Sequence, residues 1–218
     1  MSAPRWDAAI ATLAVVILYE VWLAFAQRRH PQALARSAHA SLREDWFEAV
    51  SAQRGSEVLA VQTLRNSLMS ASMTASTAVL GLMGSITLAA PSLHASFGAA
   101  QSGAPVFTPR LAMELSLLLL LFSSLASSVM AVRYYTHASF IGAMPVESAA
   151  RQRWAHAGSA YVRKAGVLYS WSLHNLLLIV PLVAFILHPY AGPVTALLVA
   201  AVLYTFDRTK GAPADDPA

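Results

Sequence analysis

Apolar runs as long as a lipid bilayer is thick recur along this chain, and they constrain its fold more than any other feature. A helix needs about 20 mostly apolar residues to cross the hydrocarbon of a bilayer. Such runs lie at Ala8–Ala26, Asn66–Ala90, Leu111–Val132 and Ala165–Leu187, and a shorter one lies at Val194–Phe206. The sequence therefore predicts an all-α integral membrane bundle with four or five transmembrane helices. The short fifth run either crosses or forms the return arm of a re-entrant hairpin.

The composition supports the same class of protein. Of the 218 residues, 56% are hydrophobic and 12% are charged, whereas a soluble domain has about 25% charged residues. The chain has no cysteine, which excludes a disulfide, a thiolate nucleophile and a cysteine-ligated metal. The net charge of +4 is typical of cytoplasmic arginines near anionic lipid. No tract interleaves aromatic and basic residues, so no nucleic-acid partner is expected.

Arginine and lysine are unevenly distributed between the loops. The segments 27–57 and 133–164 hold most of them, whereas 91–110 holds only Arg110 and 188–193 holds none. Because basic loops stay on the cytoplasmic side, we expect both basic segments to be cytoplasmic and the N-terminus to lie outside. Five crossings satisfy this pattern better than four. The expected location is the inner membrane of a bacterium.

Two stretches of the basic segments are predicted to form amphipathic helices at the cytoplasmic interface. Ser41 and Glu44 have the spacing of a capping box, which marks a helix start. Apolar residues follow it at helical spacing, namely Leu42, Trp46, Phe47 and Val50. The stretch Val146–Val162 has a similar character. We expect one transmembrane domain at residues 1–210 and a disordered tail at 211–218.

Polar residues at the cytoplasmic ends of three predicted spans suggest a site. Charge at membrane depth is costly and is usually paired or functional. The predicted site comprises Glu20, Gln62, Arg65, Asn66, Arg133 and His137. Its one carboxylate is the expected counter-charge for Arg65, and its excess positive charge suits an anion or a lipid headgroup. The alternative is that the two arginines only reach lipid phosphates and set the topology.

Three further polar residues within the predicted spans are weaker candidates. Glu114 could pair with Arg110 one helical turn away, or it could serve as a carboxylate at a channel mouth. His174 and Asn175 lie near the middle of the fourth span. A histidine there can bind haem or relay protons, but a hydrogen bond to a neighbouring helix is the expected role because no second histidine lies at its depth. No cofactor or metal is expected.

Small residues dominate the second predicted span. Serine, threonine, alanine and glycine recur between Ser67 and Ser85. Such residues allow a neighbouring helix to come close, and their hydroxyl groups could instead line a path for ions. Both interpretations stay open, and either one favours a homo-oligomer in which this helix is covered by protein.

Four segments resemble the DUF599 family of small integral membrane proteins, which occur in bacteria and plants. They are LAVQTLRNSLM (Leu59–Met69), RYYTHASF (Arg133–Phe140), RKAGVLYS (Arg163–Ser170) and GPVTALLVAAVLYTFDR (Gly192–Arg208). The resemblance implies a multi-spanning helical protein of about this length, and it implies no mechanism. The motifs of the family fall on Arg65, Asn66, Arg133, Tyr134 and His137, which adds Tyr134 to the predicted site.

These features predict a channel or transporter-like protein for a small ion or solute. Arg65, Asn66, Arg133 and His137 would form its cytoplasmic binding site, with membrane lipids and further copies of the chain as partners. The alternative is a non-transporting scaffold or accessory subunit whose basic face binds lipid headgroups or a partner protein. A third possibility is a lipid-acting enzyme. The HExxH, GxSxG, phosphate-loop and EF-hand patterns are absent, so an enzyme is not expected.

Overall fold

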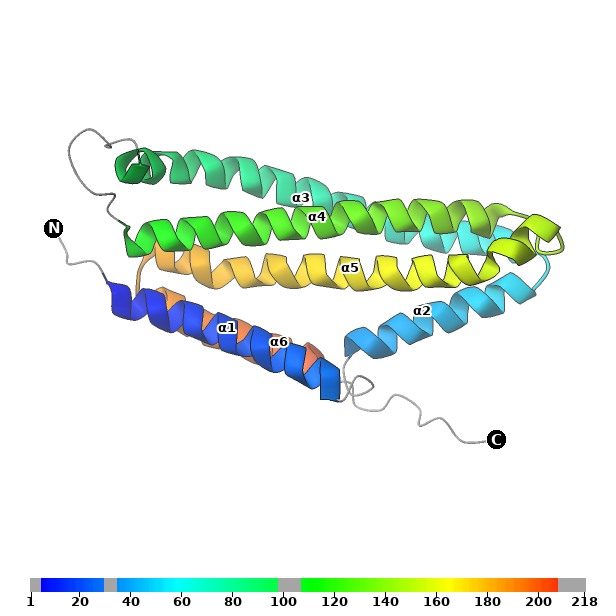
Figure 1. Cartoon of the computed structure of the whole chain (residues 1–218), viewed down its shortest axis with the longest axis horizontal. Coiled ribbons are helices and arrows are strands. Elements are labelled where there is room, and N and C mark those ends of the chain that lie inside the picture. The colour runs from blue at the N-terminus through cyan, green and yellow to red at the C-terminus, as the bar shows by residue number, and fades with distance from the viewer. Residues whose placement is uncertain (1–4, 30–34, 98–106, 208–218) are drawn as a thin grey trace. The chain divides into compact units, whose positions relative to one another are not determined.

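The computed structural model describes residues 5–29, 35–97 and 107–207. Figure 1 shows that this part of the chain is helical, without any strand. Its helices are α1 (Trp6–Arg29), α2 (Ala35–Ala52), α3 (Glu57–Phe97), α4 (Pro109–Ala143), α5 (Ala149–Leu187) and α6 (Ala191–Asp207). The predicted all-α class is confirmed. The predicted disordered tail at 211–218 lies outside the described residues.

Four of these helices, α1, α3, α4 and α5, are long and apolar enough to cross a membrane. This finding confirms the prediction of a helical membrane bundle. Helix α6 has 17 residues, which is slightly fewer than the about 20 that a perpendicular crossing needs. The fifth crossing and the orientation in the membrane stay predictions.

Helices α3, α4 and α5 are longer than a bilayer requires. They have 41, 35 and 39 residues, which corresponds to about 50–60 Å at 1.5 Å per residue. Because the hydrocarbon is about 30 Å thick, each helix must extend well beyond it. The structure differs here from the sequence prediction, because most of Val146–Val162 forms the first half of α5 and not a separate interfacial helix.

Local signals explain several helix ends. Thr108 accepts a hydrogen bond from the Leu111 amide at 3.2 Å, and Pro109 follows in the first turn of α4, where proline is favoured. Ser148 accepts the Arg151 amide at 3.1 Å at the start of α5. Gly55 has a φ of +78° between α2 and α3, a conformation that favours glycine.

The predicted α2 helix is present, but it begins earlier than expected. It starts at Ala35, so the pattern at Ser41 and Glu44 lies inside the helix and does not cap it. The residues between Ala35 and Ser41 are rich in alanine, which has the highest helix propensity. Their composition extends the helix toward the N-terminus.

The helices group into two compact units. The first unit contains α1 up to Phe25, α3 from Thr77, α4 up to Ser124, α5 from His174 and α6 up to Thr205. The second contains α2, the beginnings of α3 and α5, and the end of α4. The prediction of one transmembrane domain over residues 1–210 stays a prediction.

The core of the first unit joins α1, α4 and α5. Its buried residues are Ala8, Ala9, Met113, Leu117, Leu121, Leu182 and Phe185. Gly192 lets the start of α6 come close to this core. A Cβ atom on Gly192 would lie 2.5 Å from the Thr12 hydroxyl oxygen and 2.8 Å from the Phe185 Cβ, so a larger residue would collide there.

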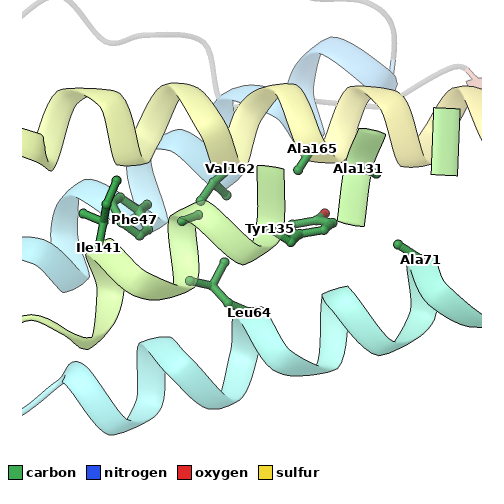
Figure 2. Packing of buried hydrophobic residues seen from close by; sticks show 9 residues of the cluster. Phe47, Leu64, Ala71, Ala131, Tyr135, Ile141, Val162 and Ala165 are labelled. Atoms are coloured by element: carbon green, nitrogen blue, oxygen red, sulfur yellow. The ribbon is translucent and has the colours of Figure 1, made fainter. Parts of the chain in front are cut away.

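The core of the second unit is shown in Figure 2. It joins Phe47 of α2 to residues of α3, α4 and α5, and its other members are Leu64, Ala71, Ala131, Tyr135, Ala138, Ile141, Val162 and Ala165. A Cβ atom on Gly158 of α5 would overlap the Phe47 ring. The glycine therefore allows α2 to dock closely on α5.

Candidate functional site

Two predicted site residues, Tyr134 and His137 of α4, meet Tyr161 of α5 in the second unit. The Tyr161 ring centroid lies 5.7 Å from that of Tyr134 and 6.0 Å from that of His137. The Lys164 ammonium lies 5.9 Å from the centre of the Tyr134 ring, within the range of a cation–π contact. Residues three apart share a helix face, which explains why both pairs face each other. We name Arg133, Tyr134, His137, Tyr161 and Lys164 the basic aromatic cluster.

The basic aromatic cluster carries excess positive charge. Arg133 and His137 lie one turn apart on α4, and both are exposed. The neighbouring Arg163 is paired with Glu44 of α2 at 3.1 Å. In contrast, the salt bridges of the described residues include neither Arg133 nor Lys164. The excess positive charge of this partly exposed patch is suited to an anion.

Three other predicted residues, Gln62, Arg65 and Asn66, lie on an exposed face of α3. In the second unit α3 runs antiparallel to α4, because Leu64 lies beside Gly142 and Ser67 beside Tyr135. Ala60 also lies beside Gly142, so Arg65 is level with about residue 137, roughly 6 Å along the axis from Arg133. The equal depth in the membrane that we expect for these two arginines stays a prediction. The joint role of Arg65 and Arg133 also stays a prediction.

Glu20 belongs to the first unit, where its partner is His174. The Glu20 carboxylate oxygen lies 2.5 Å from the Nε2 atom of His174, and the Tyr19 ring stacks on the imidazole with centroids 5.9 Å apart. His174 thus makes the hydrogen bond to a neighbouring helix that its position in the span predicts. Pairing of Glu20 with Arg65, which belongs to the second unit, stays a prediction.

Asn175 and several serines join α4 to α5. In the first unit the Asn175 amide donates to the Ser123 hydroxyl at 3.0 Å. In the second unit the hydroxyl oxygens of Ser128 and Ser172 lie 2.5 Å apart, and both side chains are buried. These serines of α4 therefore take part in helix packing.

Glu114 pairs with Arg110 on the same helix, which is the simpler of its two expected roles. The Arg110 Nε atom donates to a Glu114 carboxylate oxygen at 2.9 Å. The Glu114 side chain is buried, while that of Arg110 is more than half exposed. Arg110 and Glu114 thus form an i,i+4 pair. The exposed guanidinium of Arg110 balances the negative charge of the buried Glu114 carboxylate.

Sequence reasoning missed Tyr161, Lys164 and the pairing of Glu20 with His174. The spacing of Tyr161 and Lys164 on one helix face was a usable signal, because an aromatic and a basic residue three apart can form one patch. The Glu20–His174 pair left no such signal. Its members are 154 positions apart, and a single sequence does not reveal which helices are neighbours.

Comparisons with known proteins identify a family but no activity. The family model "Protein of unknown function, DUF599" matches residues 8–212. No curated protein and no solved structure matches the chain. Among the described residues, no group of three or more histidine, cysteine, aspartate or glutamate side chains could hold a metal ion.

Proposed function

The chain belongs to the DUF599 family, and on that premise, which brings no activity with it, we propose that it is a homo-oligomeric channel or transporter-like protein for a small anion. In this proposal it resides in the inner membrane of a bacterium, with its N-terminus outside and its basic segments in the cytoplasm. The basic aromatic cluster supplies the cytoplasmic binding site. Copies of α3 line the path.

The polar outer face of α3 is the observation that carries this proposal. In the second unit this face exposes Gln62, Asn66, Ser70 and Ser76, interspersed with the exposed side chains of Met69 and Met73. It lies opposite the buried core positions of the same helix, which include Leu64 and Ala71. The Ser70 and Ser76 hydroxyls donate to backbone carbonyls one turn earlier, at 3.0 and 3.1 Å. Their remaining acceptor capacity still faces outward.

Such a face is poorly suited to hydrocarbon. Amide side chains that lie in lipid without hydrogen-bond partners are costly. Helix α3 is also the least covered candidate span, since 17% of its apolar stretch is buried inside the protomer compared with 39% for α5. Packing of several α3 helices around a hydrated axis would cover the face and satisfy its amides and hydroxyls.

Cysteine substitutions can test this arrangement, because the natural chain contains no cysteine. Ser76→Cys places a thiol on the outer face of α3. Val129→Cys is the matched control, since Val129 is exposed on α4 and lies at about the same level as Ser76 in the antiparallel packing. The measurement is reaction with a charged, membrane-impermeant thiol reagent in proteoliposomes, together with chloride flux.

We expect the reagent to modify Ser76→Cys and to reduce chloride flux, because a charged reagent reacts only where water reaches. Val129→Cys should stay unmodified, since it would face lipid. Equal reactivity at both positions, or no chloride flux from the unmodified protein, would contradict the channel. An unreactive Ser76→Cys that forms disulfide-linked dimers on oxidation would instead favour the scaffold alternative.

A further inference from the structure

Two large aromatic side chains are exposed on α4 and α5 of the second unit, beyond the basic aromatic cluster. Phe140 is 67% exposed and Trp154 is 47% exposed. Phe140 lies three residues after His137 on α4, and Trp154 lies seven residues before Tyr161 on α5, so each shares a helix face with a member of the cluster. Arg153, which precedes Trp154, is exposed as well. We name Phe140, Arg153 and Trp154 the distal patch.

The distal patch lies on a part of the bundle that we expect outside the hydrocarbon. The stretch 149–164 of α5 holds four basic residues and no acidic one, and charge is costly in hydrocarbon. Phe140 lies near the same level, because a Cβ atom on Gly158 would be 3.2 Å from the side chain of Ile141. Aromatic residues and arginine together are typical of the centre of a protein interface. The patch therefore points to a protein partner that covers it.

The surroundings of the distal patch carry positive charge without a carboxylate to balance it. Residues 125–143 of α4 and 149–173 of α5 contain no aspartate and no glutamate. One basic residue of these stretches is buried, and Arg163 is paired with Glu44 of α2. Arg133, Arg153 and Lys164 are exposed, and the salt bridges of the described residues include none of the three. A partner with an acidic surface suits this side of the unit.

The outer face of α2 has the matching properties. Asp45 and Glu48 are exposed there, and neither belongs to a salt bridge within the part of the chain that the structure describes. Leu42 is 64% exposed beside them. The face lies opposite Phe47, which is buried in the core of the second unit. An exposed apolar side chain next to two carboxylates complements exposed aromatic rings next to cations.

We propose that the outer face of α2 in one copy of the chain binds the distal patch of a second copy. Leu42 packs against the exposed rings, and the two carboxylates lie beside the cations. Because two different faces meet, each copy can bind one neighbour on either side, and repetition can close a ring. The interface rests on the homo-oligomer of the proposed function and not on anion transport. Lys164 lies about 16 Å from Arg153 along α5, so it stays available to the anion.

Cross-linking between two differently tagged copies tests the interface. The chain contains no cysteine, so single thiols can be placed at Ala49 on the outer face of α2 and at Ala157, three residues after Trp154. The two variants are produced together in one membrane, and a short bismaleimide is added. We expect mixed product, which joins one Ala49→Cys copy to one Ala157→Cys copy, and little product from either variant alone. Ala49→Cys with Thr63→Cys, on the exposed side of α3, is the matched control and should give little product.

Charge reversal tests whether complementary charge holds the two faces together. Asp45→Lys with Glu48→Lys in the Ala49→Cys copy should lower the mixed product by about tenfold, because attraction becomes repulsion. Arg153→Glu in the Ala157→Cys copy should restore much of the product. The three reversed positions are exposed, so these changes leave the fold largely intact.

Two results would overturn the interface, namely mixed product that does not form and mixed product that charge reversal leaves unchanged. The mass of the purified wild-type complex separates the proposals. A homo-oligomer without mixed product overturns the interface and leaves the proposed function standing, whereas a monomer overturns both. Mixed product without chloride flux supports the interface while the transport function fails.

Discussion

Replacing Arg151 should destabilise the second unit more than replacing any exposed arginine. Its side chain is 1% exposed. One guanidinium nitrogen donates to the Ile141 carbonyl in the last turn of α4, and another donates to the Ser51 hydroxyl near the end of α2 at 2.8 Å. The guanidinium also lies 5.2 Å from the centre of the Phe47 ring. A cation from α5 thus binds the C-terminal ends of two other helices, where positive charge is favourable.

The size of the effect follows from these contacts. Each charge-assisted hydrogen bond contributes about 1.5–3 kcal/mol, and desolvation of the guanidinium opposes part of this gain. We expect Arg151→Ala to lower the free energy of unfolding by about 3–5 kcal/mol, because it removes both hydrogen bonds and leaves a cavity. Arg151→Met keeps most of the volume. It should cost about 1–3 kcal/mol, because the Ile141 carbonyl still accepts the Met144 amide at 3.2 Å.

The assay is reversible unfolding in mixed detergent micelles, with the amount of denaturing detergent increased in steps. Tryptophan fluorescence can report on the transition, because one of the five tryptophans, Trp46, has its ring centroid 6.2 Å from that of Phe47 beside the Arg151 contact. A loss below about 1 kcal/mol for Arg151→Ala would refute the assigned role of the buried network. Equal losses for alanine and methionine would show that packing contributes little.

Three further predictions use the same protein. Gly192→Ala should lower the free energy of unfolding by about 1–3 kcal/mol, because its Cβ has no room. Gly84→Ala is the control, because a Cβ there meets nothing within 4 Å, and it should be neutral or stabilising in the same unfolding assay. A double-mutant cycle with Ser128→Ala, Ser172→Ala and the double variant should give a coupling energy of about 1 kcal/mol. Additive losses of unfolding free energy would argue against a hydrogen bond between the two serines. Arg133→Gln should lower chloride selectivity over sodium, measured as a shift in reversal potential in planar bilayers, and an unchanged potential would remove Arg133 from the anion path.

The centres of the membrane helices could be predicted from the sequence, whereas the ends of α3 and α5 could not. Hydropathy falls sharply before Ala165 because arginines precede it, and this change suggested the start of a span. The hydrogen bonding of the backbone does not depend on that change in hydropathy. Since no proline or glycine turn interrupts Ala149–Leu187 before Pro181, the hydrogen bonds of the helix continue through the polar half.

The candidate site was predictable only in part, for a related reason. Periodicity shows which residues share a helix face, and so it placed Arg133 and His137 together. It does not show which face of another helix lies opposite. The contacts of Tyr161 with Tyr134 and of Glu20 with His174 depend on that choice.

The lengths of α3, α4 and α5 have a mechanical consequence. A helix of this length that crosses the hydrocarbon leaves about 20–30 Å outside it. A rod that tilts by about 10° inside the bilayer moves the tip of a 25 Å extension by roughly 4 Å. A small change of tilt is therefore larger at the end of such a helix than inside the bilayer.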